Sequence, residues 1–381
     1  MSKPKKLDIK KPVKLIFAGG FLGSGKTTAL AELAKRSILQ GMKVGIITND
    51  QSENLADTVI VRELLTKLEV PVEEVVKGCF CCKFDELIDH MEKILAHDPD
   101  LMLGEPVGSC TDFVAAVANP IKIHYRQAFT FAPFSTMVDP DRVRELLLGE
   151  TETNFPEEVS YLFHKQLEEA DIIVLNKIDL LDDQEINRLC VALKEKFDQK
   201  EVMAISAKKG DGMEKWLDIL LSGRPGANTV LRQIDYDRYA TAEAVLGWLN
   251  AAVKIKSPEP FESGELLYTL ASTFQEAFKR KDAEIGHLKL VFTSGGKSIW
   301  GNVTHLAGQP AISGKSLGQL SNGTLIVNAR VRIEPNELET IVRNSLAKIS
   351  TEKKISSEID DLQCFSPAYP EPPHMIREVI Q

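Results

Sequence analysis

The chain has 381 residues, 43% of them hydrophobic, and a formal net charge of −9. This length is enough for two domains with sizeable cores, and the composition is that of an ordinary globular protein. The acidic balance argues against a broad nucleic-acid surface, although residues 1–12 form a short basic arm. No stretch reaches the ~18 consecutive apolar residues of a membrane span, and no signal peptide is recognisable. We therefore expect a cytoplasmic protein without nucleic-acid or membrane partners.

The first expected element is an apolar strand at residues 13–17, followed by a glycine-rich turn and an amphipathic helix at residues 28–40. The turn matches the P-loop pattern G-x-x-x-x-G-K-[ST] at every fixed position. In such a loop, backbone N–H groups face a polyphosphate, the lysine reaches its outer phosphates and the threonine hydroxyl ligates Mg²⁺. The predicted phosphate-binding residues are Gly20, Gly23, Ser24, Gly25, Lys26, Thr27 and Thr28.

Apolar strand-like runs then alternate with amphipathic helical stretches up to residue 221. The expected strands are residues 43–48, 72–76, 101–103, 128–138, 172–175 and 202–205. The expected helices are residues 59–68, 84–95, 113–118, 141–148, 157–168, 184–197 and 213–221. This alternation predicts an α/β fold with a mostly parallel sheet covered by helices on both faces. Such a sheet binds ligands beyond the carboxyl ends of its strands.

Three of the six cysteines crowd into one turn between an expected strand and an expected helix. The thiols of Cys79, Cys81 and Cys82 can converge on one soft cation, leaving a fourth tetrahedral position open. An open position suits metal transfer better than a structural role. Zn²⁺, Co²⁺, Ni²⁺ and Cu⁺ are all compatible with these thiols. The alternatives are a half-buried apolar cluster and a redox pair.

Glu105 and Gly108 follow the strand expected at residues 101–103. An acid at this strand end can hold Mg²⁺ directly or through water, and Gly108 can offer its backbone N–H to a γ-phosphate. The predicted catalytic residues are Lys26, Thr27, Glu105 and Gly108, with Thr27 and Glu105 as Mg²⁺ ligands. The alternative is that Glu105 is an ordinary loop carboxylate.

Asn176, Lys177 and Asp179 follow another expected strand and resemble the N-K-x-D guanine-recognition motif of GTPases. Guanine presents two N–H donors on its Watson–Crick edge, which one carboxylate can accept together and which adenine does not offer. Ser206, Ala207 and Lys208 resemble the loop that packs under guanine in many GTPases. These residues favour GTP over ATP. The alternatives are a helix N-cap by Asp179 and an ordinary turn at residues 206–212.

The remainder of the chain has a different pattern. Beyond a Gly- and Pro-containing linker, helices are expected at residues 242–252, 266–278 and 335–346, and strands at residues 286–292, 297–303 and 324–331. This order predicts an α+β domain with one antiparallel sheet, whose Ser294-Gly-Gly296 segment forms a hairpin turn. The expected domains are 1–12 (basic arm), 13–222 (P-loop domain), 223–236 (linker), 237–349 (α+β domain) and 350–381 (a charged, proline-rich tail, mobile or wrapped on the surface).

The P-loop, the cysteine cluster, Glu-Pro-Val-Gly and Asn-Lys-Ile-Asp occur in the order and approximate spacing of CobW-like metallochaperone GTPases. Residues 13–222 thus resemble a divergent member of this family, which is related to the urease and hydrogenase nickel-insertion GTPases. The resemblance implies GTP or GDP and Mg²⁺ as cofactors, and a zinc- or cobalt-class divalent metal as the transported ion. It also implies guanine binding by Asn176, Lys177 and Asp179, and metal binding by the three clustered cysteines. The implied partner is a client metalloprotein or a cobalamin-dependent enzyme.

The chain departs from the family pattern in three respects. Residues 49–53 read Asn-Asp-Gln-Ser-Glu where many relatives read N-E-F-G-E, so switch behaviour is expected to differ. The seven histidines are scattered, which argues against a histidine-rich metal store. Residues 105–112 lack the usual T-S-G-L sequence, which indicates a divergent branch.

The leading hypothesis is a slow GTPase whose nucleotide state changes the cysteine site, so that metal is held in one state and delivered in another. No arginine finger is identifiable, so a partner or a nucleotide-dependent homodimer would complete the site. The second hypothesis is a regulatory or assembly GTPase acting on a corrinoid or metalloenzyme partner, with purely structural cysteines. The third is a P-loop kinase for a small molecule, against which the guanine motif counts.

Overall fold

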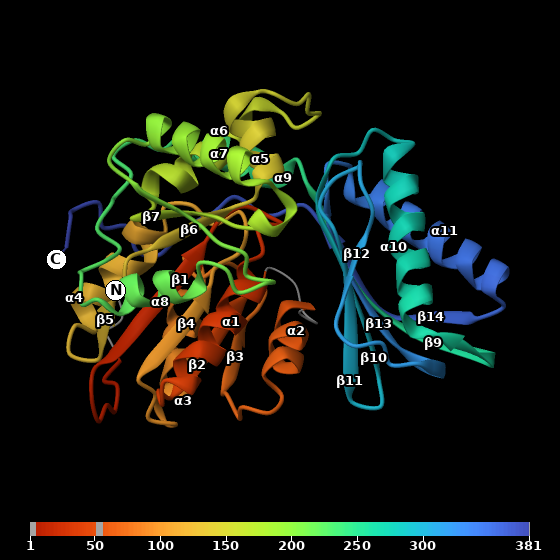
Figure 1. Cartoon of the computed structure of the whole chain (residues 1–381), viewed down its shortest axis with the longest axis horizontal. Helices are drawn as coiled ribbons and strands as arrows, with labels where there is room; N and C mark the ends of the chain where they lie inside the picture. Colours follow the sequence, from red (N-terminus) through yellow and green to blue (C-terminus); the bar gives the residue numbers. More distant parts are fainter. Residues whose placement is uncertain (1–4, 51–55, 381) are drawn as a thin grey trace.

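The computed structural model of the protein describes residues 5–50 and 56–380. These residues form two units that lie side by side, each built around one sheet (Figure 1). The first unit has a parallel sheet flanked by helices, and the second has an antiparallel sheet with its own helices. The predicted fold class is confirmed. Within the described part of the chain, no helix has the length and apolar character needed to cross a bilayer.

The first sheet has the strand order β3-β2-β4-β1-β6-β7-β8, and β5 also pairs with β1. Its strands are β1 (Val13–Gly19), β2 (Val44–Asn49), β3 (Val72–Val75), β4 (Leu101–Glu105), β5 (Phe129–Phe131), β6 (Ser135–Val138), β7 (Ile172–Leu175) and β8 (Glu201–Ala204). All pairings in this sheet are parallel. The strands β2, β4, β6 and β7 are buried at every position, as expected where helices cover both faces.

The connections of this sheet are helical. They are α1 (Lys26–Leu39), α2 (Ala56–Leu65), α3 (Phe84–Leu95), η1 (Val114–Ala118), α4 (Asn119–His124), α5 (Pro140–Arg142), η2 (Val143–Leu148), α6 (Glu157–Glu169), η3 (Ile178–Leu180), α7 (Asp183–Lys196) and α8 (Met213–Leu221). The strand expected at residues 128–138 is two short strands, β5 and β6, which pair with successive parts of β1. Pro133 lies between them, and proline has no N–H for the ladder.

The second sheet has the strand order β12-β11-β10-β13-β9-β14, and each pairing is antiparallel. Its strands are β9 (Gly247–Glu262), β10 (Ile285–Ser294), β11 (Lys297–Val303), β12 (Ala311–Ser313), β13 (Gln319–Val331) and β14 (Ser356–Phe365). The helices α10 (Ser263–Lys279) and α11 (Pro335–Lys353) cover the face turned away from the first unit (Figure 1). The predicted hairpin is confirmed: Gly295 and Gly296 form a two-residue turn with φ of 58° and 73°.

The helix expected at residues 242–252 is wrong from residue 247 onward. Helix α9 (Tyr236–Ala244) ends before that point, and the following residues begin the long strand β9. Leu249 and Val253 on this strand pack into the core of the second unit, whereas Trp248 packs into the core of the first. Because both faces of β9 are apolar here, the run lacks the alternation of a one-sided strand, so it resembles a buried helix.

The boundaries expected around the second unit also change. Tyr239 and Ala242 of α9 belong to the core of the first unit, so the two cores meet near residue 247 rather than at residue 236. Residues 350–365 are not a tail: α11 extends to Lys353, and β14 pairs with β9 as an edge strand. Charged side chains on an edge strand discourage pairing with a further strand. Because of these charges, the segment lacked the apolar pattern by which a strand is recognised in the sequence.

Residues 366–380, here called the return segment, run back to the first unit. The amide of Asn119 donates to the carbonyl of Ile376 at 2.8 Å. Arg377 pairs with Asp112 at 2.7 Å, and the Asp112 side chain is fully buried. The return segment therefore wraps the first unit through specific contacts.

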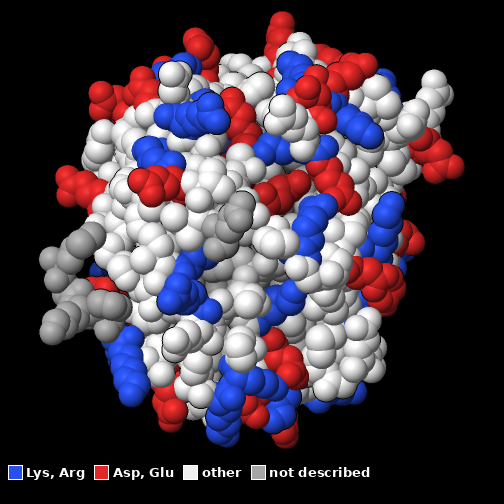
Figure 2. All heavy atoms as spheres, turned by 90° about the vertical axis from the view of Figure 1, so that its left-hand side faces the viewer, with Lys and Arg blue, Asp and Glu red and all other residues white. Residues whose placement is uncertain are grey.

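Residues 5–12, the described part of the basic arm, also lie on the first unit. Lys5 pairs with Asp89 and Glu92 on α3, each at 2.6 Å, and Lys11 pairs with Asp100 at 2.5 Å. Figure 2 shows the face of the first unit opposite the second, where Lys and Arg are interspersed with Asp and Glu. Among the described residues on this face, no single sign dominates, so it lacks the one-signed field typical of nucleic-acid surfaces.

Glu169, the last residue of α6, generates a pH-dependent stability. Its Oε1 accepts the Val114 N–H at 2.6 Å, and the residue is 1% exposed. Burial, together with the nearby Asp112 carboxylate, raises the pKa of Glu169 from 4.5 to about 8. Between these values the native state binds one proton more than the unfolded state, so stability falls as pH rises. Between pH 5 and 8 we expect the unfolding free energy of the wild type to fall by about 3 kcal/mol more than that of Glu169→Gln, because the variant lacks this titrating group. Urea unfolding at a series of pH values measures the difference.

The matched control is Glu168→Gln, which changes the adjacent and more exposed carboxylate. An equal slope of stability against pH in the wild type and in Glu169→Gln would contradict this assignment.

Candidate functional site

The glycine-rich turn lies between β1 and α1, at the carboxyl edge of the first sheet. Gly20 and Gly25 have φ of 127° and 90°, values that other residues rarely adopt. A Cβ on Gly20 would lie 2.1 Å from the Met137 carbonyl oxygen, and one on Gly25 would lie 2.5 Å from the Asn176 amide. Glycine is therefore required both for the backbone angle and for close approach. Lys26 bends back over the turn, where its Nζ donates to the Gly20 carbonyl at 2.8 Å.

Three loops at this edge are joined by one asparagine. The Asn176 Nδ2 donates to the Ser24 carbonyl at 2.9 Å, and its Oδ1 accepts the Ala207 N–H at 3.0 Å. The Ser206 hydroxyl donates to Asp179 at 2.6 Å. The structure thus brings the P-loop together with both loops that the sequence assigned to guanine.

Thr27, Asp57 and Glu105 form a buried polar cluster. The Thr27 Oγ1 lies 2.8 Å from the Asp57 carboxylate and 3.0 Å from Glu105 Oε1. Glu105 Oε2 is buried and has no hydrogen-bond partner within the described residues. Burial and the Asp57 charge raise the pKa of Glu105 to about 7. One hydroxyl and two carboxylates, one of which keeps an unpartnered oxygen, form the hard donor set that fits Mg²⁺.

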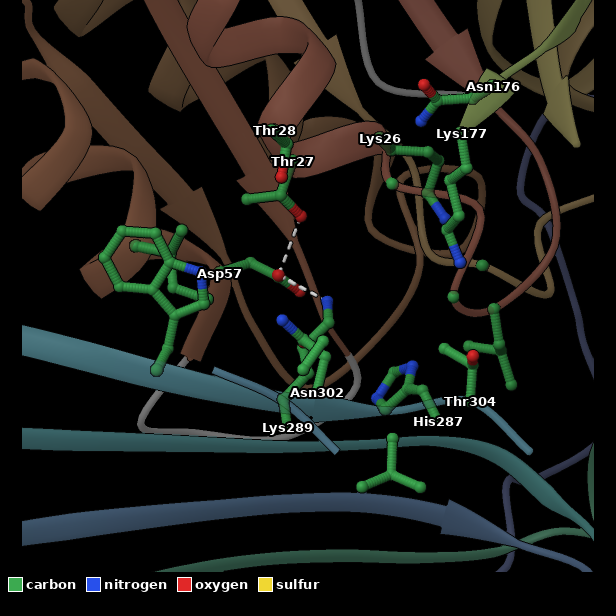
Figure 3. Close-up of a pocket in the computed structure, with 18 of the residues that line it drawn as sticks. Lys26, Thr27, Thr28, Asp57, Asn176, Lys177, His287, Lys289, Asn302 and Thr304 are labelled. Carbon is green, nitrogen blue, oxygen red and sulfur yellow. Dashed lines mark hydrogen bonds and ion pairs between the residues drawn. The ribbon is translucent and has the colours of Figure 1, made fainter. Parts of the chain in front are cut away.

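Sequence patterns did not identify Asp57 and Lys289 as residues of this site. Asp57 lies in the first turn of α2, and Lys289 lies on β10 of the second unit, where its ammonium pairs with the Asp57 carboxylate (Figure 3). Burial alone would raise the pKa of Asp57, but the Lys289 charge lowers it to about 2. Neither residue belongs to a motif, and 232 positions separate them. Only the packing of the two units brings the pair together.

A cavity of about 460 Å³ lies between the P-loop and the second sheet (Figure 3). Its lining from the first unit includes Gly23, Gly25, Lys26, Thr27, Thr28, Asp57, Glu105, Gly108, Asn176, Lys177, Asp179, Ala207 and Lys208. Its lining from the second unit includes Trp248, His287, Lys289, Trp300, Asn302, Thr304 and Arg330. Pockets of this volume suit nucleotide-sized ligands. The second unit therefore forms a wall of the cavity that the P-loop lines, which the sequence did not predict.

The cysteine cluster lies on the turn between β3 and α3. The sulfurs of Cys79, Cys81 and Cys82 lie within 4.8 Å of one another, and all three are free thiols. Cys79 and Cys81 are buried, and Cys82 is half-buried. Hydrogen bonds from the other two thiols lower the pKa of Cys82, which favours its thiolate form. Three clustered soft donors fit a zinc-class ion.

The return segment covers this turn. The backbone of Glu371 lies beside the Cys82 sulfur. The His374 ring packs against Phe84 with ring centroids 4.7 Å apart. The cysteine cluster is therefore closed by residues almost 300 positions away in the sequence.

Asn49 connects the carboxyl end of β2 to the cysteine turn. Its Nδ2 donates to the Gly78 carbonyl at 2.7 Å, and its Oδ1 accepts the Phe80 N–H at 2.9 Å. The next residue, Asp50, pairs with Arg330 of the second unit at 2.6 Å. Residues 51–53 of the segment expected to act as a switch lie outside the described residues. The described part of that segment contacts both the cysteine turn and the second unit.

The fold and this edge of the sheet define a P-loop nucleotide-binding protein. Residues 14–204 match the model of the CobW/HypB/UreG nucleotide-binding domain, and the chain belongs to this family. The zinc chaperone CobW of a Sinorhizobium species is 29% identical over 213 residues, covering 50% of this chain and 58% of that protein. The zinc chaperone CobW of Pseudomonas aeruginosa is 26% identical over 255 residues, covering 58% of this chain and 65% of that protein.

The similarity thus spans less than two thirds of either curated relative. Among solved structures, the Zn(II)-bound YjiA GTPase from E. coli aligns with a TM-score of 0.35 at 14% identity, covering 88% of this chain and 99% of that one.

Lys289→Met tests the link between the two units. The change leaves Asp57 buried without its cation, and breaking a buried pair in this way costs about 3 kcal/mol. We expect that loss of unfolding free energy in the nucleotide-free protein, measured by urea denaturation. A smaller loss is expected with a Mg²⁺–GTP analogue bound, because the metal ion would then supply positive charge beside Asp57.

The control is Lys297→Met at the exposed start of β11. Equal losses in both variants would show that the pairing of Asp57 contributes nothing.

Proposed function

We propose that this protein is a GTP-binding and GTP-hydrolysing metallochaperone that couples nucleotide state to the binding and delivery of a zinc- or cobalt-class metal. The observation that carries this proposal is the connection between two sites in one unit. Asn49 hydrogen-bonds the cysteine turn, and it lies at the edge that holds the P-loop and the two guanine-type loops. The curated relatives named zinc chaperone CobW support a metal as cargo.

In this proposal the nucleotide cavity works by positioning. Lys26 and the backbone N–H of Gly108 bind the terminal phosphates, and Asn176, Lys177 and Asp179 bind guanine. Mg²⁺ held by Thr27 and Glu105 would neutralise phosphate charge. Lys289 of the second unit also lies at the cluster of Thr27, Asp57 and Glu105, where it is bound to Asp57. No arginine finger is identifiable in the sequence, so slow intrinsic turnover is expected.

Delivery requires a partner. The proposal includes a client metalloprotein, or a cobalamin-dependent enzyme, that receives the metal when the nucleotide state changes. A nucleotide-dependent homodimer is one arrangement that would complete the hydrolytic site. The thiols are the cargo site, and the cargo must leave past the return segment, which contacts Cys82.

A second candidate function is favoured by the burial of the thiols. Cys79 and Cys81 are only 6% and 2% exposed, which suits a structural metal in a regulatory GTPase that acts on a corrinoid or metalloenzyme partner. Metal content that is stoichiometric and indifferent to nucleotide would favour this alternative.

Asp179→Asn tests guanine recognition. A carboxylate can accept two N–H donors of guanine, whereas an amide presents one acceptor and one donor. In the variant, guanine loses one charge-assisted hydrogen bond, and one of its N–H groups faces the N–H group of the asparagine. We expect this to cost about 3 kcal/mol of binding free energy, or about 100-fold in GTP affinity. Xanthosine triphosphate, which carries a carbonyl at that position, should lose less. Calorimetric titration of both nucleotides measures the change.

The matched control is Asp182→Asn, which caps α7 beyond the cavity. Unchanged discrimination between the two nucleotides in Asp179→Asn would exclude the proposed base contact.

Replacing Cys79, Cys81 and Cys82 together by serine tests the cargo site. Hydroxyls are poor ligands for soft cations, so we expect stoichiometric zinc binding to be lost. Metal analysis of purified protein, with and without a non-hydrolysable GTP analogue, measures this. The control is Cys190→Ser, which changes a half-buried thiol on α7. Stoichiometric metal that persists in the triple variant would refute the metallochaperone proposal.

A further inference from the structure

A fourth thiol lies against the cysteine cluster. Cys110 follows β4, on the same loop as Glu105 and Gly108, and is 7% exposed. Its side chain lies beside that of Cys81, the residue that also contacts Cys79 and Cys82. Sequence patterns assign this residue no role, because it lies outside the cysteine motif.

We propose that Cys110 is the fourth ligand of the metal site and that its loop reports the nucleotide state to the metal. This inference rests on the proposed function, since it takes the other three cysteines as cargo ligands. Four thiols complete the tetrahedral set that zinc prefers, and no residue from a partner is then needed.

The position of Cys110 suits a ligand that can join or leave. Its sulfur is not among the three that lie within 4.8 Å of one another, and it contacts the cluster at Cys81. A small movement of the loop or side chain decides whether four sulfurs or three surround the ion. A site with three thiols keeps an open position for a client's ligand, whereas a site with four is closed.

The loop links this thiol mechanically to the phosphate site. Gly108 packs on the P-loop, where a Cβ would lie 3.2 Å from the Leu22 nitrogen. The amide of Gln166 donates to the carbonyls of both Gly108 and Cys110, at 2.9 and 3.1 Å. The Cys110 N–H donates to the Val107 carbonyl at 2.8 Å. These bonds hold the loop as one piece, so a displacement at Gly108 reaches Cys110.

The experiment counts sulfur ligands by X-ray absorption on zinc-loaded protein, free of nucleotide, with GDP and with a non-hydrolysable GTP analogue. We expect four sulfurs in the wild type in at least one state. In Cys110→Ser and Cys110→Ala we expect three sulfurs and a lighter ligand in that same state. Competition with a chromophoric chelator should show zinc affinity reduced about tenfold or more there. The affinity difference between GDP and the GTP analogue should shrink to less than about twofold.

Cys190→Ser is the control and should match the wild type. The wild-type sulfur count tests the inference even if a Cys110 variant fails to fold, which circular dichroism would show. Three sulfurs or fewer in every wild-type state, or four sulfurs retained in Cys110→Ser, overturns the inference while the metallochaperone proposal stands. No zinc in the wild type in any state overturns both.

Discussion

Buried ion pairs between the two units are the constraint on which the cavity at the P-loop depends. Arg330 pairs with Asp50 at 2.6 Å, with 1% and 8% of their side chains exposed, and Lys289 pairs with Asp57 nearby. A buried charge that loses its partner is costly, so a small separation of the units is unfavourable unless water or another ion enters. Arg142 adds donors to the carbonyls of Ile285 (2.5 Å) and Thr304 (2.6 Å). The second sheet therefore acts as part of the site, although its core is separate.

Two consecutive residues at the end of β2 connect the three functional parts of the molecule. Asn49 holds the cysteine turn, and Asp50 holds the second unit through Arg330. β2 pairs with β4, whose end carries Glu105 and continues into the loop of Gly108. A movement of these strand ends would therefore displace the cysteine turn, the loop of Gly108 and the wall of the cavity together. A close-packed interior has low compressibility, so a shift of one strand end displaces the neighbouring strand ends as well.

The predictable parts were those fixed by local chemistry. The P-loop glycines, the residues around Asn176 and the cysteine turn lie where strand and helix patterns place them, because parallel strands end at one edge. Residues 247–252 at the start of the long strand β9 were assigned to a helix because the two faces of the strand contact different cores. Asp57, Lys289 and Cys110 carry no motif and meet their partners only through packing across long stretches of chain. Sequence periodicity predicts which face of a helix or strand is buried, but it does not predict which residues that face contacts.

The return segment has a consequence for the order of folding. Asn119 and its acceptor at Ile376 are separated by 257 positions, so the loop-closure entropy of this contact is large and its formation is favoured once the intervening chain has folded. During synthesis the cysteine turn is complete long before residues 366–380 emerge and lay Glu371 over Cys82. Until then Cys82, the half-buried thiol of the cluster, lacks the cover of that segment, whereas Cys79 and Cys81 lie in the core of the first unit. The newly made chain thus passes through an interval in which Cys82 can be reached without displacing the segment that later contacts it.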